Sequence, residues 1–557
     1  PRQVQVARLR GKIQLDFGFR KKGNGSAARS NGNAWVGSRG LPLTDCTSVK
    51  KLQGMVRFLP AILLLTLFEG LVATSGVMSV KRPNVVFILV DDLRYDVFGY
   101  MNHPFVETLN IDALAMGGMQ FENAFVTTSL CSPARASFLT GRYMHNHKVV
   151  DNADKMPEGT VTFPMLFQQA EYETAFIGKW HMGGSSDAVR PGFDHWVSFR
   201  GQGSYFPEGQ NLNINGRSVP QQKYMTDELT DHAISWLDNR GREKPFLLYL
   251  SHKGVHGFYD PAPRHLGHYS NETYIPYSEE VSVDDVDKLK PMWVRDQRNS
   301  WHGIEFPYHG RAEQTVAEMY RRYCEMVLSV DESVGRVLTA LKRMEITDDT
   351  LIIFTSDGGH LWGEHGLIDK RCAYEASIRI PFLFHWPKAI KPGSICSAIA
   401  TNIDVAPTLL ALAGIPIPAE VDGSSLRKFL FEPGSVDERP PFVYEYYWDP
   451  SFPHTPTTFA VRNERFKLIQ YHGIWDTDEL YDLKADPQET TNLILEPAYQ
   501  DRVEELREIL YQRLLQTRGL SIRLGRKRDH GQNLRSATNS KRSSFPSHMI
   551  SMPSEDR

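Results

Sequence analysis

The sequence predicts an α/β fold, with a large, mostly parallel sheet sandwiched by helices and a smaller C-terminal α+β subdomain. Four apolar runs have the composition of buried strands: 85–90, 174–177, 246–250 and 351–355. Amphipathic helical patterns at 226–239 and 313–344 alternate with these runs. Strands that alternate with helices are typical of a parallel sheet covered on both faces.

The N-terminal region is basic over its first fifty residues and rich in Gly, Ser and Asn, and Met55 is its first methionine. From Met55, one arginine precedes a short apolar run and the small residues 73–76, as in a secretory signal peptide. We expect 1–54 to be an over-called, disordered extension and 55–79 a signal peptide of a secreted or periplasmic protein. The alternative is a membrane anchor, but the run is short and Glu69 interrupts it, so no stable membrane span is expected.

A polar cluster follows each of the four predicted strands, at 91–92, 178–181, 251–256 and 356–358. Ligands of parallel sheets bind beyond the carboxyl ends of the strands, so these clusters are expected to form one site. Asp91, Asp92 and Asp357 in these clusters offer oxygen ligands suited to Ca²⁺ or Mg²⁺. A lone aspartate more often caps a helix, but three at converging strand ends favour a cation site.

Changes in composition and in expected secondary structure divide the rest of the chain. Residues 255–312 are rich in His, Tyr and Pro and are expected to be an insertion near the mouth of the site. Short strands within 440–495 and a helix at 498–516 suggest a second unit. We therefore expect a catalytic domain at 80–430, a C-terminal subdomain at 431–518 and a disordered basic tail at 519–557.

Composition excludes several classes of protein. The chain has 63 Lys and Arg against 66 Asp and Glu, so no nucleic-acid partner is implied. With Cys46 upstream of the signal and Cys131 in the motif below, Cys324, Cys372 and Cys396 allow at most one disulfide. No cysteine pair has the spacing of zinc ligands.

The run Cys131-Ser132-Pro133-Ala134-Arg135, continued by 136–143, resembles the signature of type I sulfatases. In that family a maturation enzyme oxidises the cysteine to formylglycine, whose hydrate is a geminal diol. One hydroxyl attacks sulfur, and the other lets the covalent sulfate collapse and leave. If a helix starts near Cys131, Arg135 lies one turn on, on the same face. A buried free thiol beside an ordinary helix is the alternative.

The resemblance covers about residues 82–495 and implies the alkaline-phosphatase-like fold of that superfamily. It is carried by 83–92, the Cys131 signature, 178–181, 355–359, 363–366, 369–371 and 479–483. It implies that the calcium ligands are Asp91, Asp92, Asp357 and the formylglycine from Cys131. It also implies that the sulfate-binding and acid–base residues are Arg135, Lys179, His181, His256 and Lys370.

The implied roles agree with the chemistry of these side chains. Each lysine is a point charge that can hold sulfate oxygens. His181 could act on a proton of the diol, and His256 could protonate the leaving alcohol, although His252 competes for that role. One position departs from the family, because Gly358 stands where a donor side chain is usual. The alternatives are that a water or His360 substitutes for it, or that the metal is held more weakly.

The segments 251–256, 261–265 and 366–371 resemble segments of glycan sulfatases of the N-acetylglucosamine-6-sulfatase and mucin-desulfating type. The resemblance implies hydrolysis of a sulfate ester in a sulfated carbohydrate, such as 6-sulfated N-acetylglucosamine. The alternatives are an arylsulfatase of other specificity, a phosphoesterase on the same scaffold, and a non-catalytic glycan-binding relative weakened at Gly358.

Overall fold

The computed structural model describes residues 82–521, apart from 184–185, 274–275, 277–289, 299–314, 433, 435–438 and 450. The expected extension 1–54, the signal peptide 55–79 and the tail from 522 onward lie outside these residues, as does much of the stretch 255–312. Among the helices of the described residues, none is long and apolar enough to span a bilayer.

The main element is a ten-stranded sheet in the order β13-β2-β12-β9-β1-β8-β4-β5-β6-β7. Its centre is parallel and consists of β9 (Thr350–Ser356), β1 (Asn84–Val90), β8 (Phe246–Ser251), β4 (Glu173–Gly178) and β5 (His195–Ser198). The flanking strands are mostly antiparallel: β12 (Phe382–His385), β2 (Met119–Phe121), β13 (Ser394–Cys396), β6 (Asn211–Ile214) and β7 (Arg217–Pro220). Within this group, β13 and β2 pair in parallel with each other. The four predicted strands are therefore four neighbours at the centre of the sheet.

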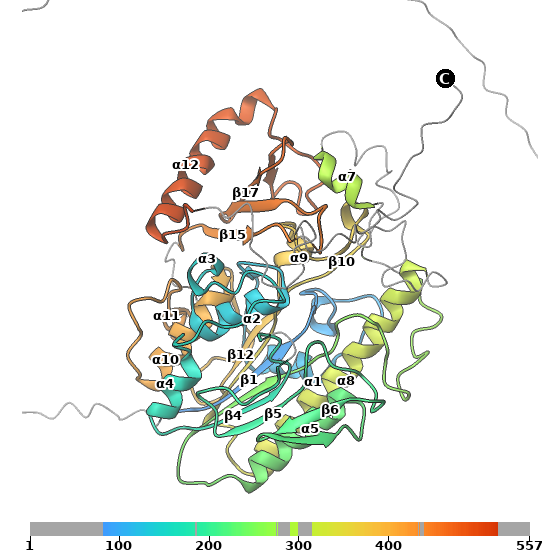
Figure 1. Cartoon of the computed structure of the whole chain (residues 1–557), viewed down its shortest axis with the longest axis vertical. Coiled ribbons are helices and arrows are strands. Elements are labelled where there is room, and N and C mark those ends of the chain that lie inside the picture. Colours follow the sequence, from blue (N-terminus) through green and yellow to red (C-terminus); the bar gives the residue numbers. More distant parts are fainter. Residues whose placement is uncertain are drawn as a thin grey trace, which may run out of the picture. The chain divides into compact units, whose positions relative to one another are not determined.

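Helices cover both faces of this sheet, because alternate residues of its central strands point to opposite sides. Val85, Phe87 and Leu89 belong to one apolar core, while Val86 and Ile88 belong to another. The first core includes residues of α2 (Cys131–Thr140), α4 (Phe163–Gln169) and α10 (Val405–Ala413). The second includes residues of α1 (Leu109–Gly117), α5 (Met225–Asn239) and α8 (Val316–Arg343). This layering, visible in Figure 1, confirms the predicted fold class and the two predicted helices.

The described residues also contain several short elements. Two small sheets pair β3 (Ala124–Phe125) with β14 (Ala400–Thr401) and β10 (Leu361–Trp362) with β11 (Ile368–Asp369). Short helices are α3 (Met144–His147), α7 (Met292–Arg298), α9 (Glu375–Ile378) and α11 (Arg427–Phe431). Single 3₁₀ turns occupy Gly99–Met101, Glu364–Gly366, Asn402–Asp404 and Pro497–Tyr499.

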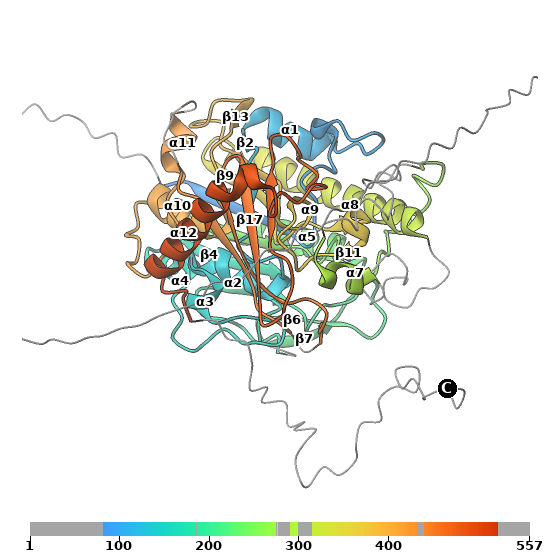
Figure 2. The ribbon, with the colours of Figure 1, turned by 90° about the horizontal axis from the view of Figure 1, so that it is seen from above.

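The C-terminal part is a four-stranded antiparallel sheet with one long helix, as predicted. Its strands are β15 (Phe442–Tyr446), β16 (Thr457–Arg462), β17 (Phe466–His472) and β18 (Glu479–Asp482), and α12 (Gln500–Gln516) packs on β15, β16 and β17 (Figure 2). One face of this sheet, including Tyr444 and Ile469, belongs to the first core of the large sheet. The C-terminal sheet therefore shares its core with the catalytic part.

The cysteines within the described residues are all unpaired. Cys131, Cys324, Cys372 and Cys396 are buried free thiols. The single disulfide that the sequence allowed does not form among them.

Candidate active site

The polar clusters that follow the four central strands meet at one edge of the sheet. The main-chain N–H of Asp357, after β9, donates to the carbonyl of Val90 in β1 at 3.1 Å. On the other side of β1, the N–H of Val255 donates to the carbonyl of Asp91 at 2.8 Å. These bonds hold the strand ends in register, so side chains far apart in sequence lie together.

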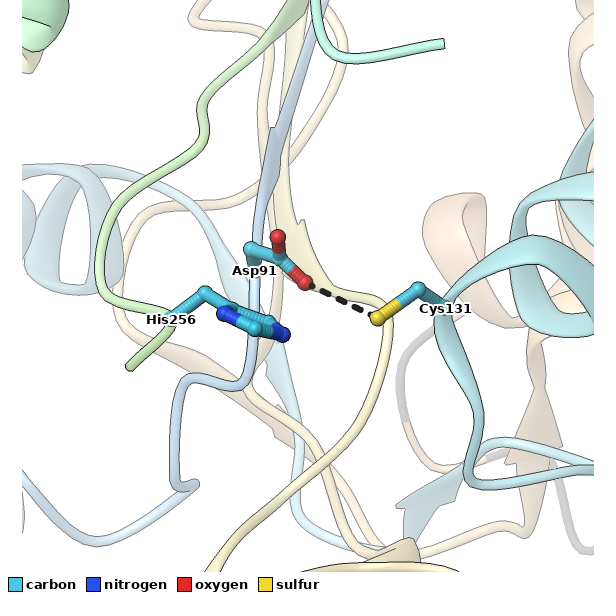
Figure 3. A group of neighbouring side chains, drawn as sticks. All are labelled: Asp91, Cys131 and His256. Carbon is cyan, nitrogen blue, oxygen red and sulfur yellow. Dashed lines mark hydrogen bonds between the residues drawn. The ribbon is translucent and has the colours of Figure 1, made fainter. Parts of the chain in front are cut away.

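Cys131 is the first residue of α2, and every residue of this helix is buried. Its thiol donates to Asp91 Oδ1 at 3.4 Å, and Lys370 Nζ donates to its sulfur at 3.0 Å. Figure 3 shows the sulfur pointing at the Asp91 carboxylate, with the ring of His256 beside them. Burial, reinforced by Asp91, raises the pKa of the Cys131 thiol to about 12, so the group is a neutral thiol here.

Three buried carboxylates form the centre of the site. One oxygen each from Asp91, Asp92 and Asp357 can lie within 4.8 Å of the others. The N–H of Asp92 also donates to Asp357 Oδ1 at 3.1 Å, which holds two of them together. Hard oxygen donors so arranged suit a divalent cation.

The protonation of these carboxyls also fits a cation. Burial, with the charges of Asp91 and Asp357, raises the pKa of Asp92 to about 7, although Lys370 opposes this. Burial likewise raises the pKa of Asp357. Burial would raise the pKa of Asp91 too, but Lys179 and other cations hold it well below its usual range. A bound cation would favour the ionised form of all three, so the residues present fit the ion.

The basic residues are divided between the carboxylates. Lys179 pairs with Asp91, and Lys370 pairs with Asp92. Arg135, one turn into α2, bonds Asp357 Oδ2 through Nε at 2.7 Å. Its NH2 lies 3.6 Å from Asp91 Oδ1. The guanidinium of Arg135 therefore holds two carboxylates in place.

The competing histidines occupy different places. His256 can bring a ring nitrogen within 4.8 Å of Cys131 Sγ and an Asp91 oxygen, and its Nε2 is 3.7 Å from Asp92 Oδ2. His252 instead bonds Ser333 Oγ of α8 through Nε2 at 3.1 Å. The structure thus places His256, and not His252, beside Cys131.

His181 follows β4 and has a left-handed backbone, with φ of 59°. Burial and the charge of Lys179 hold the pKa of His181 well below its usual range, so its ring is neutral. Burial and, next, the charge of Lys179 also lower the pKa of His256. The hydroxyl of Ser132 contacts both the carbonyl and the ring of His181.

No donor side chain stands at Gly358. A β-carbon there would lie 3.2 Å from Ser129 Oγ and 3.9 Å from Lys370 Cδ, close to the carboxylate cluster. His360 does not replace the missing donor, because Nδ1 bonds the carbonyl of Leu361 at 2.7 Å and Nε2 bonds Tyr259 OH at 3.0 Å.

Three further residues support the site and were not predicted. Tyr323 OH donates to the carbonyl of Asp92 at 3.0 Å, and Tyr205 OH donates to the carbonyl of His256 at 2.6 Å. Ser132 lies within the Cys131 signature, but that pattern assigns it no partner. Because each contact joins distant segments, nothing in the local sequence could have revealed it.

Two models of known protein families match this sequence. The sequence model described as Sulfatase matches residues 83–415. A second, described as N-sulphoglucosamine sulphohydrolase, C-terminal, matches residues 363–516.

Relatives and solved structures agree with these matches. The chain is 33% identical to an N-acetylglucosamine-6-O-sulfatase of Bacteroides thetaiotaomicron, over 77% of this chain and 86% of that protein. It is 29% identical to the human N-acetylglucosamine-6-sulfatase, over 78% of this chain and 85% of that protein. A solved structure of a protein in complex with its substrate, D-glucosamine-2-N,6-O-disulfate, is 32% identical with a TM-score of 0.73, covering 79% of this chain and 99% of that one.

Proposed function

The chain belongs to the sulfatase family and is a sulfuric ester hydrolase, and we propose that it releases sulfate from a sulfated glycan, with 6-O-sulfated N-acetylglucosamine as the preferred unit. The names of its relatives support this substrate. The observation that carries the chemistry is the contact of Cys131 with Asp91 and Lys370 at the carboxylate cluster.

Two groups complete the proposed site. Cys131 is matured to formylglycine by a maturation enzyme, and Asp91, Asp92 and Asp357 bind Ca²⁺, for which Mg²⁺ could substitute, with the matured residue as a further ligand. When present, the hydrated aldehyde supplies a hydroxyl to attack sulfur and a second to release sulfate, and the cation offsets negative charge. The Sγ atom of Cys131 stands in for one oxygen of that hydrate.

The lysines hold the anionic group of the substrate. Lys370 Nζ is 3.0 Å from Cys131 Sγ, so its ammonium lies within reach of both the nucleophile and a sulfate bound to it. Lys179 flanks the other side of Asp91. Arg135 keeps Asp91 and Asp357 oriented for the cation. Together these positively charged side chains stabilise the negative charge that grows on the sulfate oxygens.

The histidines move protons. His181 is neutral before substrate binds and can accept a proton from the nucleophile. His256 is proposed to protonate the leaving alcohol. A bound sulfate anion favours the protonated ring, which offsets the low pKa that burial and Lys179 give His256.

The location follows from the N-terminal pattern. We place the enzyme outside the cytoplasm, secreted or periplasmic, because residues 55–79 have the composition of a signal peptide. A partner from the maturation machinery would act on the chain before export.

The substrate is tested with a panel of sulfated mono- and disaccharides against nitrophenyl sulfate. We expect the highest kcat/KM for 6-O-sulfated N-acetylglucosamine, because contacts to the sugar orient the reacting bond. If the aryl ester is best and the 6-sulfated sugar is inert, the glycan assignment is wrong, while sulfatase activity stands.

The nucleophile is tested by the mass of the peptide that contains Cys131. Conversion to formylglycine exchanges sulfur for oxygen and removes two hydrogens. An unmodified thiol in protein that turns over sulfate esters would contradict the proposed nucleophile. A fully matured protein that turns over no ester in the panel would favour a glycan-binding role.

A further inference from the structure

We propose that Ser132 is a positioning residue that selects the tautomer of His181, so that Nδ1 carries the ring proton and Nε2 is free to accept one. This inference rests on the proposed role of His181 as a proton acceptor. It concerns the residue next to the nucleophile in sequence, to which the signature assigns no role.

The argument begins with the single proton of the Ser132 hydroxyl. Ser132 is fully buried, and its Oγ lies 2.6 Å from the carbonyl oxygen of His181. Two oxygens so close need a hydrogen between them, and a carbonyl has none to give. The hydroxyl proton therefore points at the carbonyl of His181.

The second contact of the same oxygen then has only one possible direction. Ser132 Oγ lies 3.3 Å from His181 Nδ1. Because its proton is already committed, Oγ can only accept, so Nδ1 must carry the hydrogen. A neutral imidazole has a single N–H, and Nε2 is left with its lone pair.

The free nitrogen belongs to the active site. Within the described residues, Nε2 of His181 has no hydrogen-bond partner, whereas Nδ1 has Ser132. The charges of Lys179, Asp91 and Lys370 act both on the ring of His181 and on the thiol of Cys131. In the opposite tautomer Nε2 would carry the ring proton and could not accept one.

Ser132 also supports the backbone of His181. The φ of 59° is a left-handed conformation, which is uncommon for residues with a β-carbon. The bond from Ser132 to the carbonyl of His181 stabilises this turn. The N–H of Ser132 is itself held by Asn152 Oδ1 at 3.0 Å, which secures the first turn of α2. One turn of helix thus presents the nucleophile and orients the base.

The same helix provides a matched control. Ser137 is also fully buried, and its Oγ lies 3.1 Å from Nε2 of His147. His147 is not among the residues gathered at the carboxylates. Ser137→Ala therefore removes the same kind of hydroxyl and the same kind of contact, away from the reaction.

The first measurement compares kinetics, with rates divided by the fraction of Cys131 converted in each preparation. We expect Ser132→Ala to lower kcat by about 10- to 100-fold with little change in KM, as for other residues that orient a catalytic group. Ser137→Ala should keep the parent kcat. Equal kcat in the two variants would overturn the proposal, even if both lower Tm.

The second measurement needs no turnover. In unmutated protein labelled with ¹⁵N-histidine, the signal of His181 is assigned by its loss in His181→Gln, and its shift tells which ring nitrogen is protonated. We expect protonation at Nδ1, and loss of that preference in Ser132→Ala. A proton on Nε2 in the unmutated protein would overturn the proposal outright.

The two claims fail in different ways. If His181→Gln turns over the substrate at the parent rate, the proposed role of His181 is wrong, and no role remains for Ser132 in the reaction. If His181 is required, but Ser132→Ala keeps both the parent kcat and the Nδ1 proton, the tautomer inference alone is wrong.

Discussion

Cys131 lies where an unmodified thiol would react poorly. Asp91 accepts from it, Lys370 donates to it, and burial raises its pKa to about 12, so almost no thiolate exists near neutral pH. A nucleophilic cysteine needs a depressed pKa. The proposed conversion to formylglycine would supply a nucleophile that does not depend on a thiolate.

We expect Cys131→Ser to abolish turnover while the fold persists. A serine hydroxyl could attack sulfur but could not expel the sulfate afterwards, and the small substitution should change stability by less than about 1 kcal/mol. Sulfate release and intact mass after incubation with substrate test this, because a trapped serine sulfate adds to the mass. Turnover near the parent rate would contradict the diol mechanism.

Gly358, the residue after Asp357, brings no donor side chain to the carboxylate cluster. We expect chelation to remove activity and Ca²⁺ to restore it, and Gly358→Asn to tighten Ca²⁺ binding about tenfold, or 1.4 kcal/mol. The added side chain starts 3.2 Å from Ser129 Oγ, so Ser129 must shift slightly. Calcium titration of chelator-treated protein measures the change.

Gly358→Ala is the control for that experiment, since it adds the same β-carbon without a donor. It should leave the Ca²⁺ affinity near that of the parent. Full activity in excess chelator after long dialysis would rule out the cation. Equal affinities for the Asn and Ala variants would show that position 358 does not reach it.

At the scale of elements, α3 is joined to the C-terminal sheet by a buried histidine. His145 Nδ1 lies 3.0 Å from Glu445 Oε2 of β15, and Nε2 lies 2.9 Å from the carbonyl of Thr517 after α12. Burial alone would lower the pKa of His145, but Glu445 and Thr517 raise it above its usual range. The charged ring therefore stabilises the contact between these elements.

This contact predicts a pH-dependent stability. A histidine whose pKa is raised by folding stabilises the folded state fully at pH values below its unfolded-state pKa of about 6.5. This stabilisation is lost as the pH rises through the folded-state pKa. We expect His145→Gln to destabilise by about 2 kcal/mol at low pH and by less as pH rises. Tm measured from about pH 5.5 upward tests this sign.

The surface histidine His268 supplies the comparison for that series. It is exposed, so His268→Gln should change Tm little at any pH. A difference between the parent and His145→Gln that grows with pH would contradict the assigned direction.

At the scale of the whole molecule, the C-terminal sheet is part of the catalytic core. Tyr444, Tyr446 and Ile469 belong to the same apolar core as Phe87 of the central strand. Lys467 of β17 is buried and bonds Glu375 of α9 at 3.0 Å and Glu489 at 2.5 Å. The two parts should therefore unfold together.

We expect one calorimetric transition for the whole described chain, and Lys467→Met should shift all of it to lower temperature. Removing the ammonium leaves two buried carboxylates without this partner, which costs about 3–5 kcal/mol. Lys388→Met breaks an exposed pair with Asp349 and should have little effect. A separate, lower transition for the C-terminal part would contradict a shared core.

The sequence by itself determined the class of fold and of reaction. Apolar runs that end in polar clusters are local patterns. They identified the strands β1, β4, β8 and β9, and their alternation with helices indicated that these strands are parallel. The signature at Cys131 identified the sulfatase family for the same reason, since neighbouring residues carry it. Strand direction alone then required that Asp91, Lys179 and Asp357 meet at one edge.

Only the tertiary structure decided which side chains act together there. His252, His256 and His360 all follow central strands, but His252 bonds Ser333, His360 bonds Tyr259, and His256 lies beside Cys131. Arg135 bonds Asp357, 222 positions away. Contacts of this kind depend on packing between distant segments, which no local pattern encodes.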